Sequence, residues 1–207
     1  MKNFSISMGI VDFIPVILFS IAAIMLQRDL YNKMSKGAFA LFAVGTIDII
    51  CAGMAKALYK LLYGAGICDF KTLNDIFFPM QSLGFLMAGV GILAMLFHKQ
   101  GKDAVLSAAP PIFGGTVLFV SGMCIGLLFI YICLCIISVK LKKPFLIVIF
   151  IISFLCSLAM GYLSSKDFSL SYINWIAQGI NIVGQGLLLY GVVVMQRAGL
   201  SELIIRK

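Results

Sequence analysis

Long apolar stretches follow one another along the chain, with short polar breaks between them. A helix needs roughly 20 mostly apolar residues to cross a hydrocarbon core about 30 Å thick. Stretches of that length run from about Met8 to Gln27, Ala38 to Tyr59, Asp75 to Phe97, Phe113 to Val139, Phe145 to Leu163 and Leu170 to Met195. The sequence therefore predicts an all-α fold: a polytopic membrane protein with about six transmembrane helices, in one domain over residues 1–207.

The composition excludes a water-soluble fold, because 62% of the residues are hydrophobic and only 12% are charged. The net charge is +8, but the Lys and Arg residues stand singly or in small groups between the apolar stretches. This pattern is typical of loops at lipid head groups. We therefore expect membrane lipids, and no nucleic acid, among the partners. A Lys-rich, Arg-poor chain is also compatible with a bacterial plasma membrane.

No residue pattern indicates an enzyme or a cofactor. Cys68 is the one cysteine outside the apolar stretches, so the sequence does not indicate a disulfide. His98 is the one histidine, so a metal site or a His-assisted nucleophile could use at most one histidine. No phosphate-binding glycine loop is present. The alternative is a carboxylate pair, Asp12 with Asp48, across the first two helices.

The last apolar stretch carries a stripe of amides. Asn174, Gln178, Asn181 and Gln185 recur at steps of four, three and four, so all project from one helical face. Amides that face lipid leave donors and acceptors unpaired, at a cost of a few kcal/mol each. The stripe must therefore face protein, ligand or water, and Trp175 beside it could stack on a planar solute.

Two interpretations of the stripe remain open. Amides can join neighbouring helices through hydrogen bonds, without any ligand. Interleaved Gly179, Gly184 and Gly186 leave room for a solute and favour a ligand or permeation surface. Gln81, which heads a face of small residues in the third stretch, could pack against the stripe or line the same site.

Asp48 is the deepest charge, near the middle of the second stretch. A carboxylate in hydrocarbon is protonated or finds a partner, so Asp48 is a candidate for proton or cation coupling, or else a structural residue. Lys56 and Lys60 can extend toward head groups, and Asp12, close to Pro15, can be solvated at the interface. For these three residues we expect no role in the site.

The chain matches itself weakly at an offset of 106 positions, which pairs Gly9, Phe13 and Lys36 with Gly115, Phe119 and Lys142. The matches indicate two three-helix units, 1–100 and 107–207. Three crossings per unit would give them opposite orientations, as in the inverted repeats of many transporters. The alternative is that apolar sequences match by composition alone. The units resemble the three-helix bundles of sugar-transporter folds, although Met80 interrupts their Pro-Gln dipeptide.

These patterns predict a small transporter or permeation protein that binds a polar or partly aromatic solute between the second, third and sixth stretches. Its transport mechanism would be alternating access between the two units. The alternative is a receptor or partner subunit that docks, on a second copy or another membrane protein, through the fourth and fifth stretches. The Lys and Arg bias favours an amino terminus in the cytoplasm. The predicted ligand-binding residues are Asp48, Gln81, Asn174, Trp175, Gln178, Asn181 and Gln185.

Overall fold

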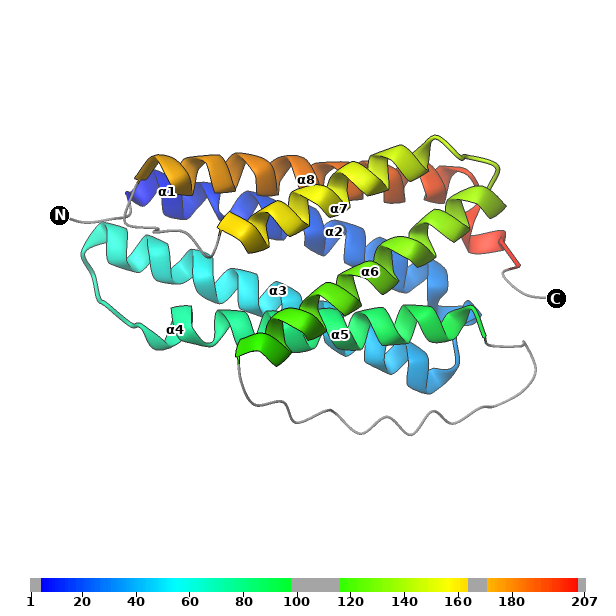
Figure 1. Ribbon diagram of the computed structural model, residues 1–207, viewed down its shortest axis with the longest axis horizontal. Coiled ribbons are helices and arrows are strands. Elements are labelled where there is room, and N and C mark those ends of the chain that lie inside the picture. Colours follow the sequence, from blue (N-terminus) through cyan, green and yellow to red (C-terminus); the bar gives the residue numbers. More distant parts are fainter. Residues whose placement is uncertain (1–4, 98–115, 164–170, 205–207) are drawn as a thin grey trace.

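A computed structural model describes residues 5–97, 116–163 and 171–204. All regular structure in this part of the chain is helical (Figure 1). The helices are α1 (Ile6–Val11), α2 (Phe13–Leu30), α3 (Lys36–Ala65), α4 (Thr72–Asp75), α5 (Phe77–Met95), α6 (Thr116–Lys140), α7 (Leu146–Leu163) and α8 (Ser171–Arg197), with 3-10 turns η1 (Tyr31–Lys33) and η2 (Leu200–Glu202).

Five helical segments are long and apolar enough to cross a membrane: Ile6–Lys33, Lys36–Ala65, Thr72–Met95, Phe119–Lys140 and Tyr172–Arg197. A sixth apolar helix, α7, is shorter and covers Leu146–Gly161 by the same measure. Large apolar side chains point outward from these helices, as expected for contact with lipid tails. The prediction of an all-α, polytopic membrane protein is confirmed.

Two prolines set the helix boundaries at one end of the bundle. Proline lacks a backbone N–H and its ring clashes with the carbonyl four residues earlier, so it is tolerated only in the first turn of a helix. Pro15 stands in the first turn of α2 and Pro79 in the first turn of α5. The helical segments before them accordingly end early, at Val11 and Asp75, with Asp12 and Ile76 as their C-caps.

The long helices form a closed ring. Helix α2 packs on α3, α3 on α5, α5 on α6, α6 on α7 and α7 on α8, and α8 packs back on α2. Glycines allow the closest contacts: Gly126 of α6 lies against the backbone of Phe85, and Gly45 of α3 lies against that of Ala88. A side chain at either glycine would overlap main-chain atoms, so these small residues fix which helices are neighbours.

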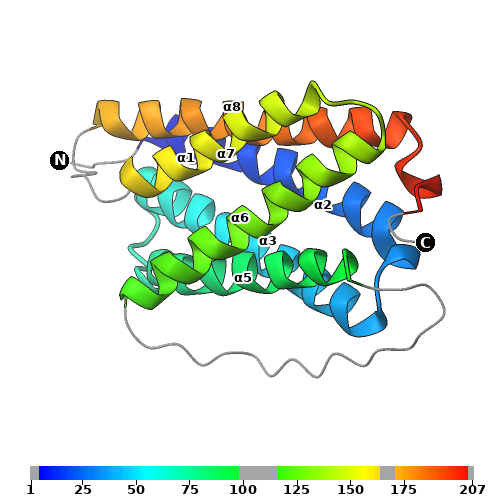
Figure 2. The same cartoon turned by 45° about the vertical axis from the view of Figure 1, so that its right-hand side comes forward.

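Helices α5 and α6 run in the same direction. Phe78 at the start of α5 packs against Phe119 near the start of α6, with ring centroids 6.2 Å apart. Further along both helices, Gly89 lies against Gly126. Figure 1 and Figure 2 both show that α2, α5, α6 and α8 share one direction, whereas α3 and α7 run the opposite way.

The parallel course of α5 and α6 determines how the two predicted three-helix units are oriented relative to each other. The first set of helices (α1, α2, α3 and α5) and the second set (α6, α7 and α8) have the same orientation. The described helices therefore do not have the expected inverted arrangement. The first helix begins at one end of the bundle and the last helix ends at the other (Figure 1).

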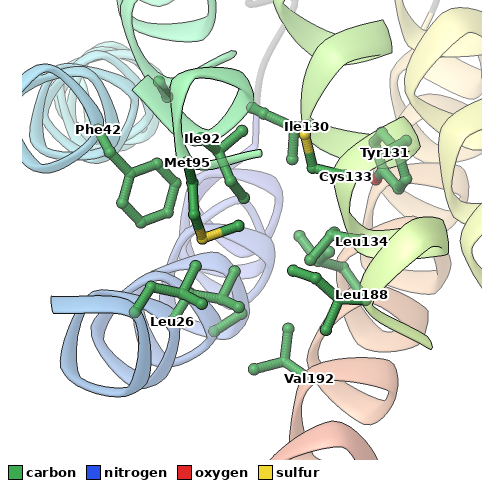
Figure 3. Close-up of a cluster of buried hydrophobic side chains, with 14 of the residues drawn as sticks. Leu26, Phe42, Ile92, Met95, Ile130, Tyr131, Cys133, Leu134, Leu188 and Val192 are labelled. Carbon is green, nitrogen blue, oxygen red and sulfur yellow. The ribbon is translucent and has the colours of Figure 1, made fainter. Parts of the chain in front are cut away.

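The half of the ring near the end of α8 contains a continuous apolar core, which we call the closed half. Figure 3 shows how side chains of the first set, such as Met95 and Leu26, face side chains of the second set, such as Leu134 and Val192. Lys33 ties the two sets together at this end, because its Nζ donates to the carbonyls of Ser201 and Leu203 at 2.9 and 2.7 Å. The core is made of Leu26, Leu30, Phe42, Ile92, Met95, Leu134, Ile137, Phe150, Val192 and Met195.

Candidate functional site

The other half of the ring contains a partly open cavity of about 160 Å³, and we call it the cavity half. It lies where α2, α5, α6 and α8 begin and where α3 and α7 end, and all six long helices line it. Aromatic rings of Phe19, Phe77, Phe78 and Phe85 form much of the apolar wall. The polar lining consists of Asp12, Lys56, Lys60, Gln81, Ser157, Asn174, Gln178, Asn181 and Gln185.

Gln178 is the most informative of these side chains. Its residue is only 3% exposed, and its Nε2 donates to the carbonyl oxygen of Met8 at 2.8 Å. Because a carbonyl can only accept, this contact fixes which end of the amide is nitrogen. The Oε1 atom is then a buried acceptor with no hydrogen-bond partner among the described residues.

The rest of the amide stripe lies on the same wall. Asn174 is 1% exposed, while Asn181 and Gln185 are partly buried. Nε2 of Gln185 reaches Oδ1 of Asn181 at 3.5 Å, and its Oε1 is buried without a partner in the described part of the chain. The face of α8 that carries the stripe therefore turns inward, and Trp175, about 100° around the helix, is 42% exposed on the outside.

The wall of the cavity includes an ion pair. Nζ of Lys60 lies 2.6 Å from Oδ2 of Asp12, and the two side chains are 9% and 14% exposed. Lys56, one turn earlier in α3, stands over the ring of Phe77, with Nζ 3.9 Å from the ring centroid. The charged groups that line the cavity are thus two ammonium groups and one carboxylate, and an aromatic ring stabilises one ammonium.

Sequence reasoning placed Asp12, Lys56 and Lys60 outside the site, and tertiary packing brings them into it. The break before Pro15 puts Asp12 between two helices, facing α3. Gly9 lets α1 pack closely against α3, since a Cβ added at Gly9 would lie 2.7 Å from Cα of Leu61. One feature of the sequence could have placed Asp12 in the site. Pro15 follows it by three residues, and a proline indicates a break in the helix just before it.

The predicted ligand-binding residues divide into two groups. Gln81 and the four amides of α8 line the cavity, but Asp48 and Trp175 do not. Asp48 is half-buried on α3, beside Gly84, at the place where α3 crosses α5. The lining also includes residues of α6 and α7, which the sequence assigned to lipid or to a partner. The role of all these residues in binding stays a prediction.

An aromatic pair marks the inner end of the cavity. Phe19 and Phe85 meet edge to face, with centroids 6.4 Å apart, and both line the cavity. Behind them lies a second space of about 20 Å³, which the same two rings, Tyr131 and Leu188 help to line. The two rings therefore border both the main cavity and the smaller space, which residues of the apolar core also line.

The described residues offer no group of three or more His, Cys, Asp or Glu side chains that could hold a metal ion. No family model matches the chain, and no curated protein or solved structure matches it. Function must therefore be inferred from the cavity, its charges and its place among apolar helices. Those features belong to a helical membrane protein with a polar cavity in one half of its bundle.

Proposed function

We propose that this protein is a small transporter or permeation protein of the plasma membrane, and that its cavity binds a small polar solute. The unpartnered Oε1 of Gln178 carries this proposal. A buried acceptor that lacks a donor costs about 1–3 kcal/mol. A solute N–H or O–H group would supply that donor, and Oε1 of Gln185 would accept a second one.

The dimensions and walls of the cavity narrow the class of solute. A cavity of roughly 150 Å³ holds a molecule the size of benzene, so about 160 Å³ suits a solute of similar size. Phe77 and Phe78 of α5 offer apolar ring surface, and the amides of α8 offer hydrogen bonds. A small planar amide or a compact polyol combines the required donors with that size.

Passage across the membrane would require two changes in the bundle. The rings of Phe19 and Phe85 would have to part, which would join the main cavity to the space behind it. The two sets of helices would then separate in the closed half, where their contact consists mainly of apolar side chains (Figure 3). Such contacts are not directional, so they can slide or open. Separation at the far end would also break the hydrogen bonds from Lys33 to Ser201 and Leu203.

The closed half also favours a second function, a receptor or partner subunit that binds the solute and does not release it on the other side. The core around Met95, Leu134 and Val192 is buried, and it lies between the cavity and the far end of the bundle. A binding protein needs only the cavity. Transport needs this core to open as well.

Binding is tested by thermal unfolding of the purified protein with four probes: urea, acetamide, glycerol and benzamide. A probe that binds only the folded state raises the midpoint in proportion to RT ln(1 + [L]/Kd). We expect at least one probe to stabilise the native protein, and Gln178→Met to abolish that stabilisation. Gln196→Met is the matched control, because Gln196 is an amide on the same helix outside the cavity lining.

Transport is tested separately, with the stabilising probe and protein reconstituted in liposomes. Flux that is lost in Gln178→Met and kept in Gln196→Met supports the transporter. Stabilisation without flux would favour the receptor. If none of the probes stabilises the protein or crosses the liposome membrane, the proposal of a cavity for solutes of this class is wrong.

A further inference from the structure

The two ends of the bundle differ in charge. The end next to the closed half carries seven of the described basic residues and two acidic ones, Asp29 and Glu202. These basic residues come from three separate places: the end of α2 through the start of α3, the end of α6 with the turn that follows it, and the end of α8. They are Arg28, Lys33, Lys36, Lys140, Lys142, Lys143 and Arg197.

At the end next to the cavity half, the charges of the described residues balance. This end carries the lysines Lys56, Lys60 and Lys71 and three carboxylates among the described residues. Two of these lysines line the cavity, and Lys60 is paired there with Asp12. Among the described residues at this end, Lys71, in the connection between α3 and α4, is the one basic residue outside the cavity lining.

The parallel course of α5 and α6 creates this asymmetry. In a chain of six strictly alternating crossings, Arg28 and Lys36 would lie on the opposite side of the membrane from Lys142 and Lys143. Because α6 starts at the same end as α5, the turn after α6 comes to the same end as the turn after α2. Basic groups that would have offset one another are therefore gathered at one end.

We infer that the end carrying Arg28, Lys142 and Arg197 faces the cytoplasm, so that the cavity faces the extracytoplasmic side. Lys and Arg near the ends of transmembrane helices are retained on the cytoplasmic side, and this bias sets the orientation of a membrane protein. Helix α1 then begins outside the cell, the reverse of what alternate crossings indicated. Together with the proposed function, this orientation means that solute enters the cavity from outside.

The orientation can be measured with cysteines and a membrane-impermeant maleimide. Native Cys68 is exposed in the connection between α3 and α4, at the cavity end. Glu202→Cys, made in a Cys68→Ser background, places an exposed thiol at the other end. The Cys68→Ser protein alone measures labelling of the remaining cysteines. All three proteins are expressed in a bacterial host and labelled in right-side-out spheroplasts, before and after permeabilisation.

We expect Cys68 to be labelled as fully in intact spheroplasts as after permeabilisation, and Glu202→Cys to be labelled only after permeabilisation. The reverse pattern would overturn the orientation. Labelling of both thiols, or of neither, in intact spheroplasts would place the two ends on one side and overturn the parallel course of α5 and α6. Since no solute is used, failure of the proposed function would leave this result unchanged.

Discussion

The cavity half and the closed half are built from the same six helices, yet one contains a cavity with polar lining and the other a buried apolar core. One face of α8 shows the difference. Residues spaced alternately four and three positions apart lie on this face, and it runs through both halves. The face begins with amides, ends with apolar side chains, and turns inward throughout. In order, its residues are Asn174, Gln178, Asn181, Gln185, Leu188, Val192 and Met195.

This comparison indicates that packing stabilises one half and polar contacts organise the other. In the closed half, side chains such as Phe150 and Met195 are fully buried against neighbours. In the cavity half, the ion pair of Asp12 with Lys60 and the hydrogen bond from Gln178 to Met8 join the helices around a space. Substitutions should therefore lower stability most in the closed half and alter solute binding only in the cavity half.

The largest effect is expected for Phe150→Ala in the closed half. Removing a fully buried ring should lower the free energy of unfolding by about 3–5 kcal/mol, because the surrounding helices cannot collapse into the space. Phe145→Ala is the control, since Phe145 is 48% exposed and should change stability little. Thermal unfolding in detergent measures both. Equal effects of the two variants would contradict the assignment of Phe150 to a tightly packed core.

Asp12→Asn should have the next largest effect. It removes the anionic partner of the Lys60 ammonium, and we expect stability to fall by about 1–3 kcal/mol. This loss is smaller than for a fully buried pair, because the cavity beside the pair is partly open. The double variant Asp12→Asn/Lys60→Met should regain part of that loss. The free energies of unfolding of Asp12→Asn, Lys60→Met and the double variant, compared with the native protein, give the coupling energy. A coupling near zero would mean that the pair does not hold α3 against the start of α2.

A smaller effect on stability is expected for Phe19→Ala, at the boundary between the halves. Phe19 is only partly buried, so we expect a loss of about 1–2 kcal/mol. Removing the ring should join the main cavity to the space behind it and raise the rate of solute flux in liposomes. Phe70→Ala, in an exposed connection, is the control. If the native protein transports the probe and Phe19→Ala transports it at the same rate, the two rings do not limit passage.

The smallest effect is expected for Asp48→Asn. Asp48 lies outside the cavity lining, so the variant should change stability by less than about 0.5 kcal/mol and leave probe binding unchanged. Thermal unfolding with and without the stabilising probe measures both quantities. The result would differ if Asp48 took part in coupling. The native protein would then show pH-dependent flux, and Asp48→Asn would lose that dependence while it still bound the probe. Such a result would support the role in proton or cation coupling for which the sequence made Asp48 a candidate.

Much of the fold could be predicted because it depends on local properties of the chain. The length of each apolar stretch identifies a helix, and the spacing of the four amides identifies one face of α8. The structure turns that face inward and brings Gln81 to the same cavity. The spacing could not show that α6 and α7 also line the cavity, because Met123 and Ser157 belong to faces without a polar pattern.

The sequence by itself determined the solvent, the helices and the face of α8 that avoids lipid, because apolar length and periodicity belong to single segments. Only the tertiary structure decided that α6 runs parallel to α5, that Lys60 meets Asp12, and that Asp48 stays outside the cavity. These features depend on contacts between segments far apart in the chain, above all the glycine contacts that bring backbones together. Periodicity specifies which way a side chain faces, and packing specifies what it meets there.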